Sequence, residues 1–163
     1  MRILFFLLIA IPVICTAQSN QKNYAVICDA FWREKKFPNG KDYRCTSLTE
    51  KDISVVEALI NDCINNYNKV AVKEYEDLRR KEPNLKIRKE DFVIRLPRYQ
   101  RQYLAFINSK GEKFIWINCF CSILRDDWRK EVLYVNDGGN CYFNLKIDLT
   151  RKKYYDLMVN GDA

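Results

Sequence analysis

The fold of this chain is decided by residues 49–82, which read TEKDISVVEALINDCINNYNKVAVKEYEDLRRKE. Thr49, with an acidic residue three positions later at Asp52, is typical of a helix start, because both side chains can cap free backbone N–H groups. Apolar residues then recur every three or four positions, at Ile53, Val56, Ile60, Cys63, Tyr67, Ala71, Tyr75 and Leu78. The pattern predicts a long amphipathic helix that ends before Pro83. Its weakest point is Asn65–Asn68, where three poor helix formers favour a break.

From about Val93 the hydrophobic period changes to two, which is typical of strands. The expected strands are Gln102–Asn108, Lys113–Cys121, Cys141–Leu149 and Tyr154–Asn160. The segment Glu131–Val135 is expected to pair with Cys141–Leu149, because the turn Asn136–Asn140 between them contains the Asp-Gly and Gly-Gly pairs that suit a tight hairpin.

A helix followed by four or five antiparallel meander strands belongs to the α+β class, since the sheet must cover an apolar face and the helix can cover it. This order of elements over residues 49–163 resembles the cystatin-like fold, with the nuclear-transport-factor-like cone fold as an alternative. The Gln-x-Val-x-Gly loop of the inhibitor cystatins is missing, so the resemblance implies a fold and no protease inhibition. We divide the chain into a signal peptide (1–17), an N-terminal docking segment (18–48) and a single α+β domain (49–163).

Residues 1–17 have the parts of a secretory signal peptide. Arg2 precedes the uncharged stretch Ile3–Cys15, and small residues at Cys15 and Ala17 precede Gln18. Thirteen residues span about 20 Å as a helix, which is shorter than the roughly 30 Å bilayer core. Bulky Ile14 disfavours lipid attachment at Cys15. The chain is therefore expected in the periplasm or outside a bacterium, and not as an integral membrane protein.

The composition excludes several kinds of chemistry. Histidine is absent, which excludes Ser-His-Asp and Cys-His catalysis and imidazole-bound metals. Lys and Arg number 28 against 21 Asp and Glu, a net charge of +7, but acidic residues accompany the short basic runs, which predicts a solvated surface of mixed charge. Attraction to anionic lipids or polyanionic glycans is the alternative. Neither a nucleic-acid motif nor a cofactor motif is present.

With Cys15 set aside, six cysteines remain, an even number that suits disulfides in an oxidising compartment. Cys28 and Cys45 flank a turn-rich segment and are candidates for one bridge. Cys119 and Cys121 share one face of a predicted strand, so a bond between them is disfavoured and one of them is expected to pair with Cys141. Buried free thiols are the alternative. Zinc and redox sites are not expected, because the chain has no Cys-x-x-Cys motif.

Alternation within Lys113–Cys121 divides its side chains between two faces. One face carries Ile115, Ile117, Cys119 and Cys121, and the other carries Phe114, Trp116, Asn118 and Phe120. If the first face meets the helix, the second lies on the far side of the sheet with Tyr142, Asn144 and Lys146. The residues expected to bind a ligand or partner there are Phe114, Trp116, Phe120, Tyr142 and Asn144. The alternative is that Phe31 and Trp32 of the N-terminal segment cover this face as ordinary core.

Three segments, Trp116–Cys121, Asp137–Cys141 and Val159–Ala163, resemble those of small exported bacterial proteins of unknown function. The resemblance implies a compartment and a compact fold but no activity. The expected function is an exported, non-enzymatic binding module for a protein, peptide or glycan, with a homodimer as one version, and Trp116→Ala is expected to leave the fold intact. The alternatives are an envelope inhibitor or immunity-type protein, and a small enzyme that depends on a thiol or on acids such as Asp91, Asp127 and Asp137.

Overall fold

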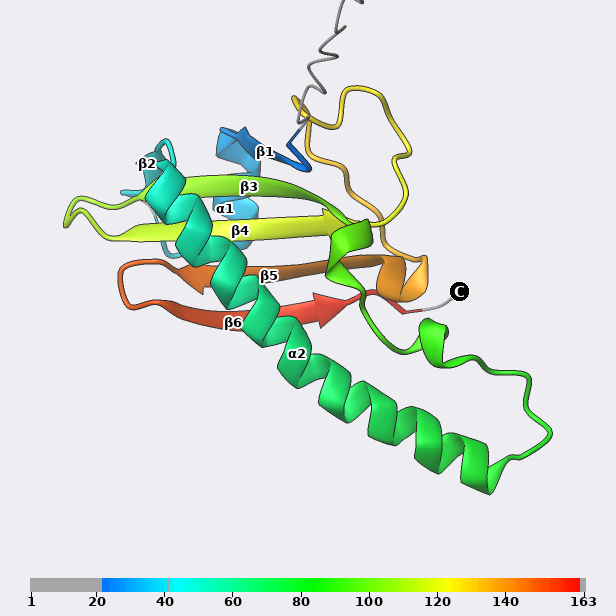
Figure 1. Ribbon diagram of the computed structural model, residues 1–163. Coiled ribbons are helices and arrows are strands. Elements are labelled where there is room, and N and C mark those ends of the chain that lie inside the picture. Colours follow the sequence, from blue (N-terminus) through cyan, green and yellow to red (C-terminus); the bar gives the residue numbers. More distant parts are fainter. Residues whose placement is uncertain (1–21, 41, 162–163) are drawn as a thin grey trace, which may run out of the picture.

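The computed structural model describes residues 22–40 and 42–161, so the expected signal peptide lies outside the described residues. The fold is α+β, as predicted, with one long helix across a mostly antiparallel sheet (Figure 1). The helices and strands are β1 (Tyr24–Ile27), α1 (Ala30–Lys36), β2 (Arg44–Cys45), α2 (Glu50–Lys81), β3 (Gln100–Ile107), β4 (Lys113–Phe120), β5 (Tyr142–Asp148) and β6 (Lys153–Val159). Short 3₁₀ turns occur at η1 (Lys89–Asp91), η2 (Leu96–Arg98) and η3 (Gly139–Cys141).

The strands follow the order β1-β3-β4-β5-β6, and β2 also pairs with β3. Strands β3 to β6 form the expected antiparallel meander, in which each strand pairs with the next one along the chain. β1 runs parallel to β3, and β2 runs antiparallel to it farther along the same edge. The segment before α2 therefore extends the sheet at one edge, while β6 forms the other.

Helix α2 packs its apolar stripe on the sheet face that the alternation pattern identified. Thr49 and Asp52 form the expected capping box at its start. The buried residues of this layer include Ile53, Val56, Ile60 and Cys63 of the helix and Ile115, Ile117, Cys119, Phe143, Leu145 and Ile147 of the sheet. The contact removes apolar surface of both the helix and the sheet from water. Burying a residue such as Ile60 contributes about 1.5–3 kcal/mol to the stability of the fold.

The helix continues without a break through Asn65–Asn68, which corrects the break expected there. The Asn68 side chain binds the backbone of Ile94 in both directions: its Nδ2 donates to the carbonyl oxygen at 2.9 Å, and its Oδ1 accepts from the N–H at 2.8 Å. Asn66 Nδ2 donates to the Tyr154 hydroxyl at 2.9 Å. Tertiary hydrogen bonds thus offset the low helix propensity of asparagine.

We expect Asn68→Ala to destabilise the protein by about 2 kcal/mol, because the Ile94 N–H and carbonyl would lose their partner. Asn65→Ala is the matched control, since Asn65 is exposed on the same helix and alanine should stabilise that position by up to about 0.7 kcal/mol. Urea unfolding of both variants measures the difference. Equal stability of the two variants would contradict the role given to Asn68.

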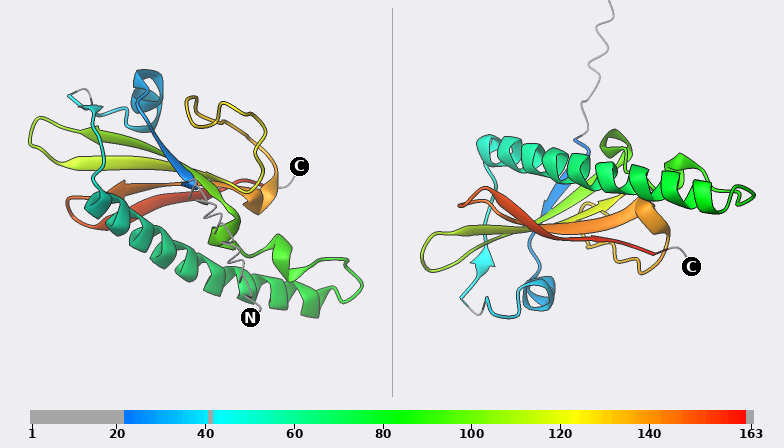
Figure 2. Two further views of the ribbon diagram at one scale, coloured as in Figure 1. Left: turned by 45° about the horizontal axis from the view of Figure 1, so that its top comes forward. Right: turned by 90° about the horizontal axis from the view of Figure 1, so that it is seen from below.

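The sheet face opposite α2 is covered, which corrects the expectation of an open aromatic surface. Helix α1 is capped by Asp29 and places Trp32 against this face. The Trp32 and Trp116 rings are stacked, with their centroids 5.5 Å apart. Trp116 is 1% exposed, Phe114 9% and Phe120 0%. The molecule therefore has three layers, with α2 and α1 on opposite sides of the sheet (Figure 2, right), and the alternative in which the N-terminal segment completes the core is the correct one.

Residues 128–135, which we call the crossing segment, lie across the same face without forming a strand. This corrects the prediction that Glu131–Val135 forms a hairpin with β5. Side-chain amides of the sheet hold their backbone. Gln102 Nε2 donates to the carbonyl oxygens of Trp128 and Glu131, and its Oε1 accepts from the Leu133 N–H at 3.0 Å. Asn118 Nδ2 donates to the Leu133 carbonyl at 2.6 Å. These amides supply hydrogen-bond partners to the backbone of residues 128–135, which therefore needs no neighbouring strand. As a result, β4 pairs directly with β5.

Candidate functional site

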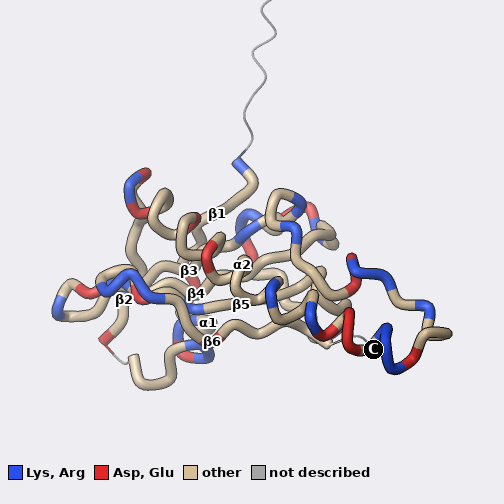
Figure 3. The backbone as a smooth tube through the Cα atoms, turned by 60° about the horizontal axis from the view of Figure 1, so that its bottom comes forward, with Lys and Arg blue, Asp and Glu red and all other residues tan. Residues whose placement is uncertain are grey.

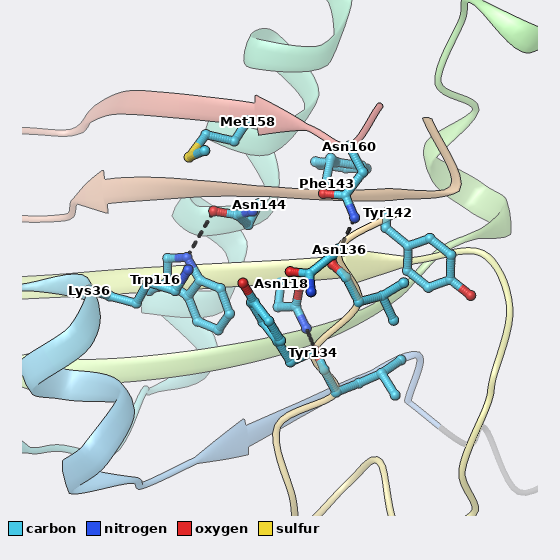
Figure 4. Close-up of a pocket in the computed structure, with 12 residues that line it drawn as sticks. Lys36, Trp116, Asn118, Tyr134, Asn136, Tyr142, Phe143, Asn144, Met158 and Asn160 are labelled. Carbon is cyan, nitrogen blue, oxygen red and sulfur yellow. Dashed lines mark hydrogen bonds between the residues drawn. The ribbon is translucent and has the colours of Figure 1, made fainter. Parts of the chain in front are cut away.

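A groove opens at the margin of the covered face, between α1, residues 133–136 and strands β5 and β6. It consists of two hollows, with volumes of about 180 Å³ and 560 Å³. Both are lined by Lys36, Trp116, Asn144 and Met158, and they therefore form one continuous groove. Figure 4 shows the smaller hollow, which is lined by side chains from α1, β4, β5, β6 and the crossing segment.

Three of the five residues predicted to bind a ligand line this groove: Trp116, Tyr142 and Asn144. The other two do not, because they belong to the core. The Phe114 ring stacks on Tyr43 with centroids 5.0 Å apart, and Phe120 meets Trp128 edge to face at 5.5 Å. The prediction of Phe114 and Phe120 as binding residues is therefore not supported by their placement.

A row of amides runs across the sheet beneath the groove. Gln102, Asn118 and Asn144 lie directly opposite one another on β3, β4 and β5. The first two are occupied with the crossing segment, but Asn144 uses its Oδ1 to accept a hydrogen bond from Trp116 Nε1 at 3.1 Å. This bond fixes the amide orientation and leaves the two N–H donors of Asn144 for the groove. Among the described residues, no hydrogen bond from those donors is found.

The walls of the groove carry exposed side chains that sequence analysis did not identify. Tyr134 of the crossing segment is 52% exposed, and Met158 of β6 is 62% exposed. Met158 reaches this face because β6 contains a bulge, at which Asp156 has a φ of 52° and the pairing with β5 shifts between Asn144 and Lys146. The extra residue lets Leu157 pack toward α2 while Met158 lines the groove. A period-two pattern cannot register such an insertion.

Lysines dominate the electrostatics of the groove. Lys35, Lys36 and Lys146 line it, and the one acidic side chain among its described lining residues is Asp156, whose carboxylate binds Lys146 at 3.0 Å. The ammonium of Lys36 lies 4.5 Å from the Trp116 ring centroid, and that of Lys35 lies 4.6 Å from the Tyr134 ring centroid. Burial, followed by the charges of Lys35 and Lys146, lowers the pKa of Lys36 below its usual value.

The basic runs elsewhere behave differently. Those at 79–81 and 86–89 are exposed at the distal end of α2 and in the segment that follows it. Figure 3 shows basic and acidic residues interspersed in the tube. Arg88 pairs with Asp91 at 2.7 Å, and Arg80 pairs with Asp77 at 3.3 Å. These runs form the mixed-charge surface that the composition predicts, so the groove is the more selective electrostatic feature.

The six cysteines within the described residues are bonded or buried. Cys28–Cys45 and Cys121–Cys141 form disulfides, as expected, whereas Cys119 and Cys63 are free among the described residues. Cys119 was a disulfide candidate, and it faces α2 in the core instead. Burial raises the pKa of Cys63 to about 11, and it raises that of Cys119 further. Buried thiols held in the protonated form are poor nucleophiles, so their environment gives no support to a thiol-dependent enzyme.

The acidic residues considered for catalysis lie outside the groove, and two of them have structural roles. Asp91 accepts the backbone N–H of Arg88 at 3.0 Å, and Asp127 binds Arg125 at 2.5 Å. Within residues 22–40 and 42–161, no group of three or more acidic or cysteine side chains is arranged to hold a metal ion. In the same ranges, no helix combines the length and the apolar character needed to cross a membrane.

Comparison of the chain with protein-family models, with curated proteins and with solved structures finds no match. The site must therefore be interpreted from its own geometry.

Proposed function

We propose that this protein is an exported, non-enzymatic binding module that holds a sugar unit of a glycan in the groove. The observation that carries the proposal is the combination of an oriented amide with unused donors, Asn144, and an exposed aromatic wall, Tyr134. Sugars present hydroxyl groups, which pair with amides, and apolar C–H faces, which pack on aromatic rings. A second amide, Asn136, is exposed in the same hollow.

The size of the groove favours a small ligand over a protein partner. The hollow lined by Tyr134 and Asn136 has a volume of about 180 Å³ and the adjoining one about 560 Å³, and small-molecule sites typically have about 300–1,000 Å³. A stable protein interface needs about 1,000 Å² or more of buried surface, whereas Phe114, Trp116 and Phe120, which were expected to supply such a surface, are already buried. A homodimer through this face is disfavoured for the same reason.

Two features support export to an oxidising compartment. The disulfides Cys28–Cys45 and Cys121–Cys141 are characteristic of proteins that fold outside the cytosol. The sequence of residues 1–17 has the parts of a signal peptide. We therefore place the protein in the periplasm or at the exterior of a bacterium, where glycans are abundant ligands.

The test is a titration of ¹⁵N-labelled protein with glucose, N-acetylglucosamine and glucuronate, followed by NMR. We expect at least one sugar to shift the indole N–H of Trp116 and the side-chain amide of Asn144, because the two groups are hydrogen-bonded at the groove floor. Asn136→Ala should weaken that binding about tenfold, the loss expected for one hydrogen bond of about 1.4 kcal/mol.

Asn84→Ala is the control, because Asn84 is equally an exposed asparagine but lies in the turn after α2. It should bind the sugar as the parent protein does. If none of the three sugars perturbs Trp116 or Asn144, the proposed function is wrong.

A further inference from the structure

The positive charges of the groove lysines are poorly neutralised by acidic side chains of the protein. Lys36 is half-buried, and the positive charges of Lys35 and Lys146 act on it by repulsion. Among the described residues, neither Lys35 nor Lys36 forms an ion pair with a carboxylate. Like charges gathered in a partly desolvated groove repel one another and destabilise the unliganded state.

Contacts with aromatic rings explain the placement of these lysines only in part. Lys36 lies near Trp116, and Lys35 lies near Tyr134, and each such contact contributes about 0.5–1 kcal/mol at an exposed site. A ring face, however, attracts each ammonium separately and does nothing to reduce repulsion between them. Only a negative charge located among the ammonium groups does so, and Asp156 supplies one charge to Lys146 alone.

We infer that the ligand of the groove carries an anionic group, a carboxylate or a phosphate on a sugar, which binds between the ammonium groups of Lys36 and Lys146. This inference rests on the proposed function and adds the chemical class of the ligand. Among the described residues, three ammonium groups and one carboxylate line the groove, so it attracts an anion and disfavours a cationic ligand. The amides and Tyr134 then contact the sugar ring beside the acidic group.

The protonation of Lys36 couples to this binding. The groups that face it are the ammonium groups of Lys35 and Lys146, the carboxylate of Asp156 paired with Lys146, and the Tyr134 phenol. Because its pKa is lowered, Lys36 loses its charge at a lower pH than an exposed lysine. Anion affinity therefore falls as the pH rises through that lowered pKa. A bound anion favours the ammonium form, so binding in this window takes up protons.

The experiment measures the affinities of glucuronate, glucose 6-phosphate, inorganic phosphate and neutral glucose by calorimetry and NMR. We expect the two acidic sugars to bind at least about tenfold more tightly than glucose, and to bind more weakly at about pH 10 than at about pH 7. The glucuronate and glucose 6-phosphate arms distinguish a carboxylate ligand from a phosphate ligand. Inorganic phosphate measures how much of the affinity the anion provides alone.

Three variants test how the charges of the groove affect binding. Lys36→Met keeps an apolar side chain over Trp116 and should lower the affinity for the acidic sugar about tenfold, a much larger loss than it causes for glucose. Lys86→Met removes the same charge from an exposed site and should leave both affinities unchanged. Asp156→Asn should tighten acidic-sugar binding severalfold by releasing Lys146, and asparagine tolerates the positive φ at this position.

The possible failures are distinguishable. If glucose binds as tightly as the acidic sugars and Lys36→Met has no effect on either, the inference of an anionic ligand is wrong, but the proposed glycan-binding function still stands. If no sugar, neutral or acidic, perturbs Trp116, both proposals are wrong. If Lys36→Met and Lys86→Met lower the affinity equally, the attraction is a general effect of net charge and the inference is overturned.

Discussion

Trp116→Ala is expected to destabilise the protein by about 3–5 kcal/mol, the usual range for removing a large aromatic side chain from a core. The indole is 1% exposed and is stacked on Trp32 with ring centroids 5.5 Å apart. Its Nε1 donates to Asn144. The truncation would leave a cavity between β4 and α1 and would also remove the bond that orients Asn144. Sugar binding should therefore be lost along with stability. Urea unfolding monitored by far-UV circular dichroism measures the effect.

Phe31→Ala is the matched control for Trp116→Ala. Phe31 precedes Trp32 on α1 and is 65% exposed, so its loss should change stability by less than about 1 kcal/mol. Trp116→Ala would also distinguish an open aromatic face from one covered by the N-terminal segment. A variant with parental stability and lost binding would agree with the open surface expected from the sequence and would contradict the buried position of Trp116.

Removal of the Cys28–Cys45 disulfide, by Cys28→Ala with Cys45→Ala, is expected to destabilise the protein by about 3 kcal/mol. The bridge joins residues 17 positions apart and closes the loop that contains α1. Without it, the unfolded chain gains conformational freedom that must be lost again on folding. Because α1 covers Trp116, we also expect faster proteolysis within residues 29–44. Thermal unfolding and limited trypsin digestion measure the two effects.

The Cys121–Cys141 pair provides the control for position. It joins residues 20 positions apart, so its removal should cost a similar amount of stability without exposing residues 29–44 to trypsin. If the Cys28–Cys45 variant were as stable as the parent protein and equally resistant, the covering of the aromatic face would not depend on this bridge.

The candidate site was partly predictable. Alternation along β4 and β5 identified Trp116 and Asn144 as residues of one face, and the structure places both at the groove floor. Lys36, Tyr134 and Met158 were missed because three separate segments bring them there, and no local pattern links those segments. One available signal was overlooked. β4 is apolar on both faces, which is typical of a strand buried on both sides, and it argued against an open surface.

The sequence by itself determined helix α2, the meander from β3 to β6 and the face on which they meet. Those features follow from periods of 3.6 and two residues, which depend only on backbone geometry and on the location of apolar side chains. Only the tertiary structure decided what covers the reverse face. Three features depend on contacts between residues far apart in the chain. They are the folding of residues 30–36 as a helix, the hydrogen bonds from Gln102 to the crossing segment, and the bulge at Asp156. Such contacts leave no period in the sequence, and the groove exists because of them.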